Sequence, residues 1–218
     1  MKSHSDKAPE FPKAVLFDLL TALLDSWSAW NAAAGSEQSG RTWRAEYLRL
    51  TYGCGAYIPY EILVRRAAEN TGLGTDAADR LESEWETLPV WSGANEVLSQ
   101  LSGKTKLAVV TNCSTRLGRV AAELLNVKWD CVVTAEEAGY YKPDIRPYRM
   151  ALDSMGVGAS EAAFVAGSAY DLFGTSKVGL RTYWHNRVGL HRPEGAPEAD
   201  FESQTLDKLI PWLKGEAR

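Results

Sequence analysis

The chain has little of what marks secreted, membrane-spanning or nucleic-acid-binding proteins. It has only three cysteines among 218 residues, and Cys54, Cys113 and Cys131 do not have the spacing of a zinc site. So few cysteines, in an odd number, indicate a reducing, cytoplasmic setting in which each is a small buried hydrophobe. Positive charge is not in excess, because the formal net charge is -4, and this argues against a nucleic-acid partner.

Long hydrophobic runs are also missing. Runs such as Ala14–Phe17 and Leu107–Val110 are far too short to cross a membrane. The first segment, Met1–Pro12, is polar, lacks the apolar core of a signal peptide and is expected to be a frayed lead-in. We therefore expect a cytoplasmic protein without a membrane partner.

What the chain does have is the alternation of an α/β fold. Short apolar runs predict buried strands at Ala14–Phe17, Leu107–Thr111, Cys131–Thr134, Ala163–Ala166 and Arg181–Trp184. Helical patterns lie between several of them, at Ala94–Leu101, Leu117–Leu125, Pro147–Met155 and Leu172–Val178. Strands that alternate with helices form parallel βαβ units, so the prediction is a doubly wound parallel sheet.

Residues 27–89 interrupt this alternation and are expected to be helical, with candidate helices at Trp43–Tyr52, Tyr60–Asn70 and Thr75–Glu86. The run Asn70–Gly74 indicates a helix stop and turn, and Thr75 is expected to be the next N-cap. We predict a core domain of residues 1–26 and 90–218, with a small helical cap at 27–89 that covers the sheet edge. Three tryptophans of the cap are expected to help wall an apolar pocket, namely Trp27, Trp30 and Trp43.

Ligands of open parallel sheets bind at the carboxyl ends of the strands, and polar residues gather there. Asp18 ends the first strand, where a desolvated carboxylate can attack carbon or phosphorus. A helix N-cap or a loop acid is the plainer interpretation. Thr111-Asn112 ends the next strand, and this pair can hold an anion or orient a carboxylate. Both residue types are also common in turns.

Two loops add charge at the same edge. Lys142, followed by Pro143, can stabilise a carboxylate, or it is an ordinary surface lysine. Asp171, at the end of the loop Gly167–Asp171, is either a second functional acid or an acid stabilised by a helix N-terminus. His185, after the last strand, is either a general base or a structural histidine. Each of these signals is weak when taken alone.

The order of these residues resembles the four motifs of the haloacid dehalogenase superfamily. An Asp after the first strand is followed by Thr-Asn, then by Lys-Pro, and then by a Gly-Ser loop with an Asp. The helical insert falls where that superfamily places a cap, so the resemblance covers nearly the whole chain. It implies a Rossmann-like core, a hydrolase activity and Asp18 as a carboxylate nucleophile.

Two positions separate the branches of this superfamily. Its phosphatases carry a second Asp two residues after the nucleophile, where this chain has Leu20, which cannot donate a proton. They also hold Mg²⁺ with paired acids in the fourth loop, where Ser168 replaces one acid. The chain is instead similar to the L-2-haloacid dehalogenases, which need no metal, so neither a metal nor a cofactor is expected.

Further matches and departures concern the cap and the first loop. The Trp-Arg pair that contains Arg44 resembles the pair whose arginine meets the leaving halide, and Lys142 followed by Tyr148 resembles the Lys-Pro and later Tyr of these enzymes. The usual Gly-Thr after the nucleophile is Thr21-Ala22 here. Ala22 therefore lacks the supporting hydroxyl, which Thr21 is in a position to replace.

The resemblance implies hydrolysis of a short 2-haloacid to a 2-hydroxy acid, with inversion at C2. Asp18 displaces the halide and forms an ester, which water then hydrolyses. In the implied roles, Arg44 and Asn112 meet the halide, Thr111 orients Asp18, and Lys142 with Asp171 keeps Asp18 ionised and positions water. The residues expected around the substrate are Leu20, Thr21, Tyr148, Ser168 and Tyr170.

Three other functions stay open at this point. One is a Mg²⁺-dependent phosphatase of the same fold, one is hydrolysis of another C–X bond through the same ester, and one is a catalytically silent binding protein. The expected partner is a small-molecule substrate, and the resemblance also implies a possible homodimer.

Overall fold

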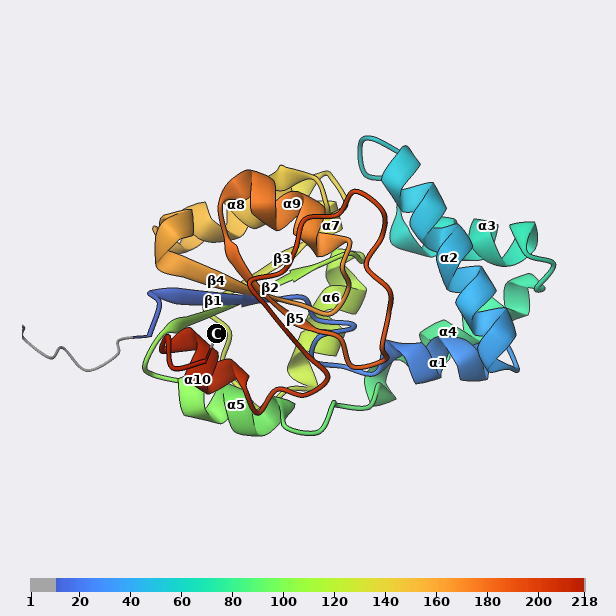
Figure 1. Ribbon diagram of the computed structural model, residues 1–218. Coiled ribbons are helices and arrows are strands. Elements are labelled where there is room, and N and C mark those ends of the chain that lie inside the picture. The colour runs from blue at the N-terminus through green and yellow to red at the C-terminus, as the bar shows by residue number, and fades with distance from the viewer. Residues whose placement is uncertain (1–10, 218) are drawn as a thin grey trace, which may run out of the picture.

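A central sheet has helices on both faces and a group of further helices to one side (Figure 1). This computed structural model describes residues 11–217, so the lead-in expected at Met1–Pro12 falls almost wholly outside the described residues. The six strands have the order β3-β2-β1-β4-β5-β6, and every neighbouring pair is parallel. Their bounds are β1 Ala14–Phe17, β2 Lys106–Thr111, β3 Cys131–Thr134, β4 Ala162–Ala166, β5 Arg181–His185 and β6 Phe201–Ser203. The predicted doubly wound parallel sheet is confirmed.

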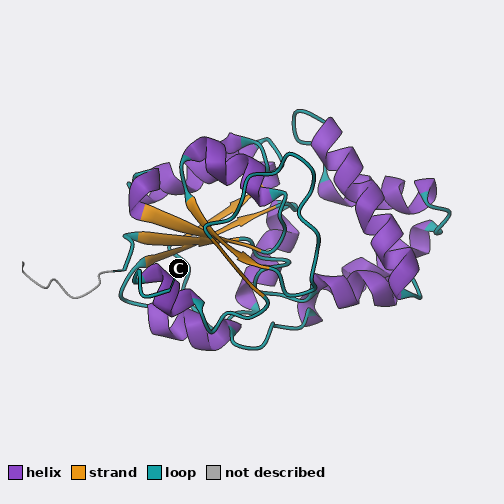
Figure 2. Ribbon diagram, in the orientation of Figure 1, coloured by secondary structure: helices purple, strands orange, loops and turns teal. Residues whose placement is uncertain are grey.

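Helices cover both faces of the sheet (Figure 2). Successive strand residues point to opposite faces, and each face has its own hydrophobic cluster. On one face, Phe17 and Val109 pack with α5 (Ala94–Leu101), α6 (Thr115–Glu123) and α10 (Leu209–Leu213). On the other face, Leu16 and Val110 pack with α8 (Ile145–Met155) and α9 (Asp171–Val178). Two short helices, α7 (Ala135–Ala138) and η2 (Ala159–Glu161), lie in the connections. Because β1 lies between β2 and β4, its carboxyl end opens at the topological switch point, where such folds bind ligands.

A helical insert, residues 26–87, lies between β1 and α5 and faces the carboxyl edge of the sheet (Figure 1). Its aromatic interior places the Trp30 ring 4.5 Å from that of Trp43 and 5.4 Å from that of Tyr47, between centroids. Its division from the rest as a cap domain stays a prediction. The elements are α1 Ser26–Ala33, α2 Glu37–Gly53, α3 Tyr60–Asn70, α4 Thr75–Ser83 and η1 Trp85–Thr87.

The differences from the sequence-based expectations are local. Helix α1 was not predicted, although Asp25 caps it by accepting a hydrogen bond of 3.0 Å from the Ser28 N–H. Thr75 was wrongly predicted as an N-cap, because Gly74 holds the extended cap position and Thr75 is already helical. Strand β6 was also missed, since its three residues at a sheet edge are not buried and contain no apolar run.

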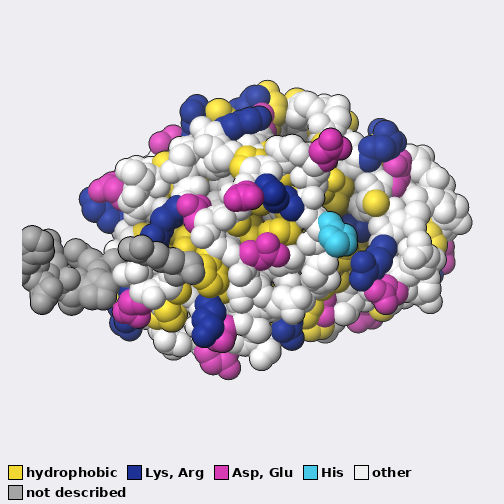
Figure 3. Space-filling view, in the orientation of Figure 1, with side chains coloured by type: hydrophobic (Ala, Val, Ile, Leu, Met, Phe, Trp, Pro, Cys, Tyr) yellow, Lys and Arg dark blue, Asp and Glu magenta, His cyan; other side chains and the backbone are white. Residues whose placement is uncertain are grey.

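Between residues 11 and 217, no helix combines the length and the apolar character needed to cross a membrane. On the face drawn in Figure 3, basic and acidic side chains are interspersed. This mixture agrees with the small negative net charge of the chain.

Candidate active site

The carboxylate of Asp18 lies at the end of β1 and is almost fully buried, with an exposed fraction of 7%. Its Oδ2 accepts three hydrogen bonds from the following turn. They come from the Thr21 N–H at 3.0 Å, the Thr21 hydroxyl at 2.5 Å and the Ala22 N–H at 3.2 Å. Its Oδ1 accepts a hydrogen bond from the ammonium group of Lys142 at 2.8 Å. The two carboxylate oxygens are therefore in different environments.

The turn that holds Asp18 is itself fixed on three sides. The Trp91 indole N–H donates to the carbonyl of Thr21 at 3.1 Å, and His185 Nδ1 lies 2.8 Å from the carbonyl of Ala22. A Cβ at Gly167 would collide with the backbone and hydroxyl of Thr21, so the β4 loop reaches this turn only because residue 167 is glycine. These contacts leave Thr21 little freedom to move away from Asp18.

A second buried acid completes the charge pattern. Lys142 Nζ lies 3.1 Å from Asp171 Oδ1, so one ammonium group is shared between two carboxylates. The same Oδ1 accepts a hydrogen bond of 2.6 Å from the hydroxyl of Tyr148. All four side chains are buried. We call Asp18, Lys142 and Asp171 the carboxylate floor.

The two acids of the carboxylate floor differ in their affinity for a proton. Burial by itself would raise the pKa of Asp18, but Lys142 and the bonds from Thr21 lower this pKa below its usual range. Burial raises the pKa of Asp171 to about 6, and Lys142 offsets this only in part because Asp18 adds negative charge. Although burial opposes it, the two acids raise the pKa of Lys142, so the lysine stays charged. Lys142 therefore lies between two acids of different character. Asp18 is ionised, which suits a nucleophile, whereas Asp171 titrates near neutrality, which suits a general base.

Asn112 was expected to meet the halide, but its side-chain amide instead positions the lysine loop. Its Nδ2 donates to the Lys142 carbonyl at 3.0 Å, and its Oδ1 accepts from the Lys142 N–H at 2.7 Å. The following Lys142–Pro143 peptide bond is cis. The carbonyl of Asn112 accepts a hydrogen bond of 3.0 Å from the Tyr47 hydroxyl of the insert. Asn112 thus links the insert to the carboxylate floor.

Above the floor, the insert contributes an arginine surrounded by aromatic rings. The guanidinium carbon of Arg44 lies 4.1 Å from the ring centroid of Trp27 and 5.7 Å from that of Trp30. Its Nη1 is 3.3 Å from the hydroxyl of Ser26, while its buried Nε has no hydrogen-bond partner within residues 11–217. Since a buried donor without a partner is costly, this group is suited to bind an anion.

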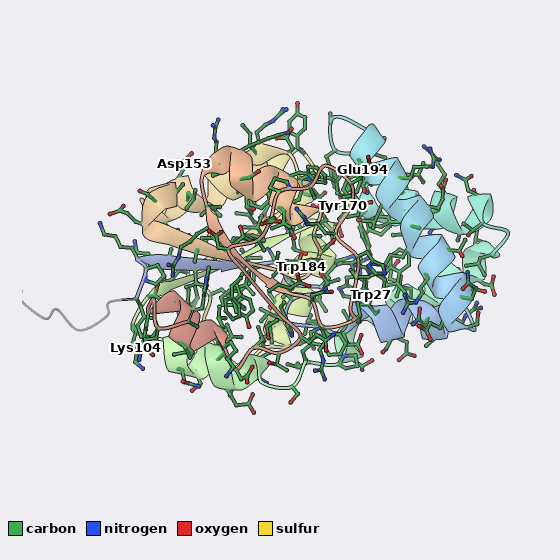
Figure 4. The ribbon with its side chains drawn as sticks, in the orientation of Figure 1. Trp27, Lys104, Asp153, Tyr170, Trp184 and Glu194 are labelled. Atoms are coloured by element: carbon green, nitrogen blue, oxygen red, sulfur yellow. The ribbon has the colours of Figure 1, made fainter. Side chains whose placement is uncertain are left out.

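The floor and the insert enclose a cavity of about 720 Å³. In Figure 4, Trp27 of α1 and Tyr170 of the β4 loop both lie between the sheet and the insert, whereas Lys104 and Asp153 lie at the distant end of the core. The cavity is lined by most of the residues predicted for the site, namely Asp18, Leu20, Thr21, Arg44, Asn112, Lys142, Ser168, Tyr170 and Asp171.

Two further predicted positions differ from expectation. Tyr148 was expected to contact the substrate, but its side chain is completely buried beneath the cavity and donates to Asp171. Thr111 was expected to orient Asp18. Its hydroxyl instead lies 3.7 Å from Cys113 Sγ, and within the described part of the chain the Asp18 carboxylate is held by other groups.

The remaining candidates divide by burial. Trp27 and Trp30 line the cavity as expected, but Trp43 is buried inside the insert, where its indole N–H donates to the Val64 carbonyl at 2.9 Å. His185 contacts the Ala22 carbonyl rather than the cavity, and burial lowers its pKa. Of the two alternatives for His185, a structural histidine or a general base, these contacts favour the structural one.

Sequence reasoning missed the tyrosines of the insert. Tyr47, Tyr52 and Tyr60 all line the cavity, and the Tyr52 ring packs 4.7 Å from that of Tyr170 across the cleft. A signal was present, since Tyr52 stands two helical turns after Arg44 and therefore shares its face of α2.

The carboxylate floor does not fit a divalent metal. Among residues 11–217, no group of three His, Cys, Asp or Glu side chains is placed to hold one. The position between Asp18 and Asp171 is taken by the ammonium group of Lys142, which supplies positive charge where a metal ion would have to lie.

Comparison with known proteins gives a consistent set of relatives. Residues 12–179 match the haloacid dehalogenase-like hydrolase family. The chain is 28% identical to (S)-2-haloacid dehalogenase 4A of Burkholderia cepacia, over 92% of this chain and 94% of that one. A dehalogenase crystal structure with an intermediate complex is 28% identical and superposes with a TM-score of 0.81, over 94% and 98% of the two chains. Phosphoserine phosphatase of Thermus thermophilus is 34% identical over 67% of this chain and 61% of its own.

Proposed function

Because the chain belongs to the haloacid dehalogenase-like hydrolase family, we propose that it hydrolyses the carbon–halogen bond of a 2-haloacid through an ester on Asp18. One observation carries this proposal. The same cavity presents an ionised, buried carboxylate at its floor and a guanidinium group with an unused buried donor in its wall. The carboxylate suits a nucleophile, and the guanidinium group suits a binding site for the leaving anion. The names of the relatives with full-length coverage agree with this pairing.

In the first step, Asp18 attacks C2 of the substrate and the carbon–halogen bond breaks, with the electron pair leaving on the halide. Oδ1 is the attacking atom that we propose, because Oδ2 already accepts three hydrogen bonds and Oδ1 accepts one. Attack from the face opposite the halide inverts C2. Arg44 binds the departing halide, and the cavity holds the reacting atoms in line.

The substrate carboxylate needs hydrogen-bond donors near the turn that follows β1. The N–H group of Leu20, which lines the cavity, has no backbone acceptor in the described part of the chain. The hydroxyl of Ser168 lines the same space. We assign the substrate carboxylate to these two groups, which leaves Arg44 for the halide.

In the second step, water attacks the carboxyl carbon of the Asp18 ester. Negative charge then develops on Oδ2, which already faces the N–H groups of Thr21 and Ala22 and the hydroxyl of Thr21. This arrangement acts as an oxyanion hole. Asp171, with its pKa of about 6, takes the proton of the water, and the 2-hydroxy acid leaves with an oxygen that came from Asp18.

Phosphate-ester hydrolysis is the second candidate, since the Thermus thermophilus relative has that activity in its name. It is disfavoured because Leu20 stands where those enzymes need an acid, and because Lys142 occupies the space between the two carboxylates. The homodimer and the cytoplasmic location belong to this proposal as expectations. Size-exclusion chromatography and cell fractionation test them.

The decisive experiment is a halide-release screen of both enantiomers of several 2-haloacids, run with EDTA and again with Mg²⁺. We expect halide release that EDTA does not remove. Hydrolysis of a phosphate ester that requires Mg²⁺, without halide release, would establish the second candidate. Absence of turnover on both panels, together with thermal stabilisation by a ligand, would indicate a silent binding protein.

A single turnover in H₂¹⁸O with enzyme in excess tests the covalent step. The ester route leaves ¹⁸O in the peptide that contains Asp18, while the first product molecule carries ordinary oxygen. Appearance of ¹⁸O in that first product, with Asp18 unlabelled, would show that the carboxylate acts as a general base for water.

A further inference from the structure

The cavity is larger than a short haloacid needs. A closed space of about 150 Å³ is enough for benzene, which has six non-hydrogen atoms. 2-Chloropropanoate also has six, whereas the cavity measures about 720 Å³ and continues outward from the carboxylate floor. The excess volume lies on the side of the insert and of the loop after β5, because residues 41–52 and 190–193 line it.

One wall of this excess volume is a single face of α2. Arg41, Arg44, Leu48 and Tyr52 recur at three- and four-residue spacing, so they share one side of the helix and line the cavity. The eleven-residue rise from Arg41 to Tyr52 spans about 16 Å. A three-carbon acid that reacts at Asp18 covers only a small part of that length.

The opposite wall carries apolar side chains beside His191 and Arg192. Tyr170, which follows β4, and Leu190 and Pro193, which follow β5, line the cavity from the core side. Tyr170 and Leu190 are half-buried, and the contact between the Tyr52 and Tyr170 rings closes one end. A planar or branched apolar group would therefore meet hydrophobic side chains on two sides.

Charge at the rim is already neutralised. Arg41 pairs with Glu37 at 2.7 Å, Arg49 with Glu46 at 2.6 Å, and Arg192 with Glu198 at 3.4 Å. These arginines have acidic partners of their own, unlike Arg44 in the interior. We therefore do not expect the rim to favour substrates with a second anionic group.

We propose that the site takes 2-haloacids whose C2 carries a bulky apolar group of phenyl size, which packs between Leu48 of α2 and Leu190 of the core and against the edge of the Tyr52–Tyr170 pair. This inference rests on the proposed function and specifies its substrate class. The chemistry is unchanged: Asp18 displaces halide from C2, and water releases the 2-hydroxy acid together with one proton. The bulky group contributes binding energy away from the reacting atoms.

The test compares the kcat/KM for chloride release from three acids with the same leaving group, namely 2-chloropropanoate, 2-chloro-3-phenylpropanoate and 2-chlorosuccinate. Bulk next to C2 slows a displacement in solution, so any preference for the phenyl compound must come from binding. We expect its kcat/KM to exceed that of 2-chloropropanoate by about tenfold or more, a factor within reach of one apolar pocket.

A variant within the proposed pocket locates the effect. Leu48→Trp fills the space between the walls and is expected to lower the phenyl-to-methyl ratio of kcat/KM by about tenfold. Ile62→Trp is the matched control, because it adds the same ring on the outer surface of α3, where Ile62 is 47% exposed and away from the cavity. Ala45→Phe, on the exposed part of the same α2 face, is the second variant in case Leu48→Trp does not fold.

The outcomes separate the two levels of the proposal. Release of chloride from 2-chloropropanoate alone, or at the highest kcat/KM, overturns the bulky substrate class but leaves dehalogenation standing. A preference for 2-chlorosuccinate shows that the rim arginines recognise a second anion, which also overturns it. No chloride from any acid removes the proposed function and this inference with it.

Discussion

The carboxylate floor and the wall contributed by the insert differ in whether their charged groups already have partners within the protein. On the floor, every charged group has a partner: Lys142 contacts both acids, and Asp18 accepts four hydrogen bonds. On the wall, Arg44 is surrounded by aromatic rings and keeps a buried donor unused within the described residues. The charged groups of the floor have partners within the protein, whereas Arg44 keeps a donor that suits an anion.

This difference separates two kinds of function. A nucleophile must be in place before the substrate arrives, and the hydrogen bonds from the following turn and from Lys142 fix Asp18 there. The leaving halide gains its negative charge only as the carbon–halogen bond breaks, so the group that binds it has no partner before the reaction. Variants of the floor should therefore change the chemical step, whereas variants of the wall should change the handling of the halide and the choice of substrate.

The largest expected effect comes from Asp18→Asn. An amide is a poor nucleophile, so kcat should fall by on the order of 10⁴-fold or more, as loss of a covalent nucleophile does in other enzymes. Chloride release measures this loss. The control is Asp153→Asn, an exposed acid at the distant end of the core, which should leave kcat unchanged. Retention of substantial activity in Asp18→Asn would show that the carboxylate floor does not supply the nucleophile.

The next effect is that of Arg44→Ala on the wall. Loss of one strong electrostatic donor should reduce kcat/KM by about a hundredfold or more, while folding changes little. Arg44→Lys restores the charge without the planar fork and should recover part of the activity. Arg66→Ala, at an exposed position on α3, is the control. Near-normal turnover in Arg44→Ala would mean that the unused donor has no role in departure of the halide.

A smaller effect should follow Thr21→Val, which keeps the shape of the side chain but removes the hydroxyl that donates to Asp18. Hydrogen bonds to charged groups contribute about 1.5–3 kcal/mol, and the two N–H donors remain, so a loss of about tenfold in kcat is expected. Thr21→Ser keeps the hydroxyl and should be nearly normal. Equal rates in the Val and Ser variants would show that the backbone alone holds Asp18.

The smallest effect concerns pH. Asp171 must be ionised to accept a proton, so kcat/KM should fall as the pH decreases through about 6, the pKa to which burial raises this group. Asp18, with its pKa lowered, stays ionised over that range. Tyr148→Phe removes a donor to the ionised form, so the acid limb should move to higher pH by about one unit. A limb that does not move would assign it to another group.

The sequence alone determined the layout of the floor. Asp18, Asn112, Lys142 and Asp171 each follow a predicted strand or lie in the next loop, and parallel strands bring their carboxyl ends to one edge whatever the rest of the chain does. The bounds of the five predicted strands agree with the apolar runs within one residue at each end, since the sheet buries most of the residues in those runs. Arg44 was found only through the resemblance, because a single arginine on a helix has no local signature.

Tertiary structure decided which of these groups touch. It placed Tyr148 beneath the site rather than in it, because α8 packs this ring against Phe164 at 5.2 Å between centroids. It also placed the Thr111 hydroxyl at Cys113 rather than at Asp18, and it holds the Thr21 turn through a close approach of the β4 loop that only Gly167 permits. The sequence determined which residues follow each strand. The distance between side chains of different loops, and with it the partner of each charge, was decided only when the helices packed on the two faces of the sheet.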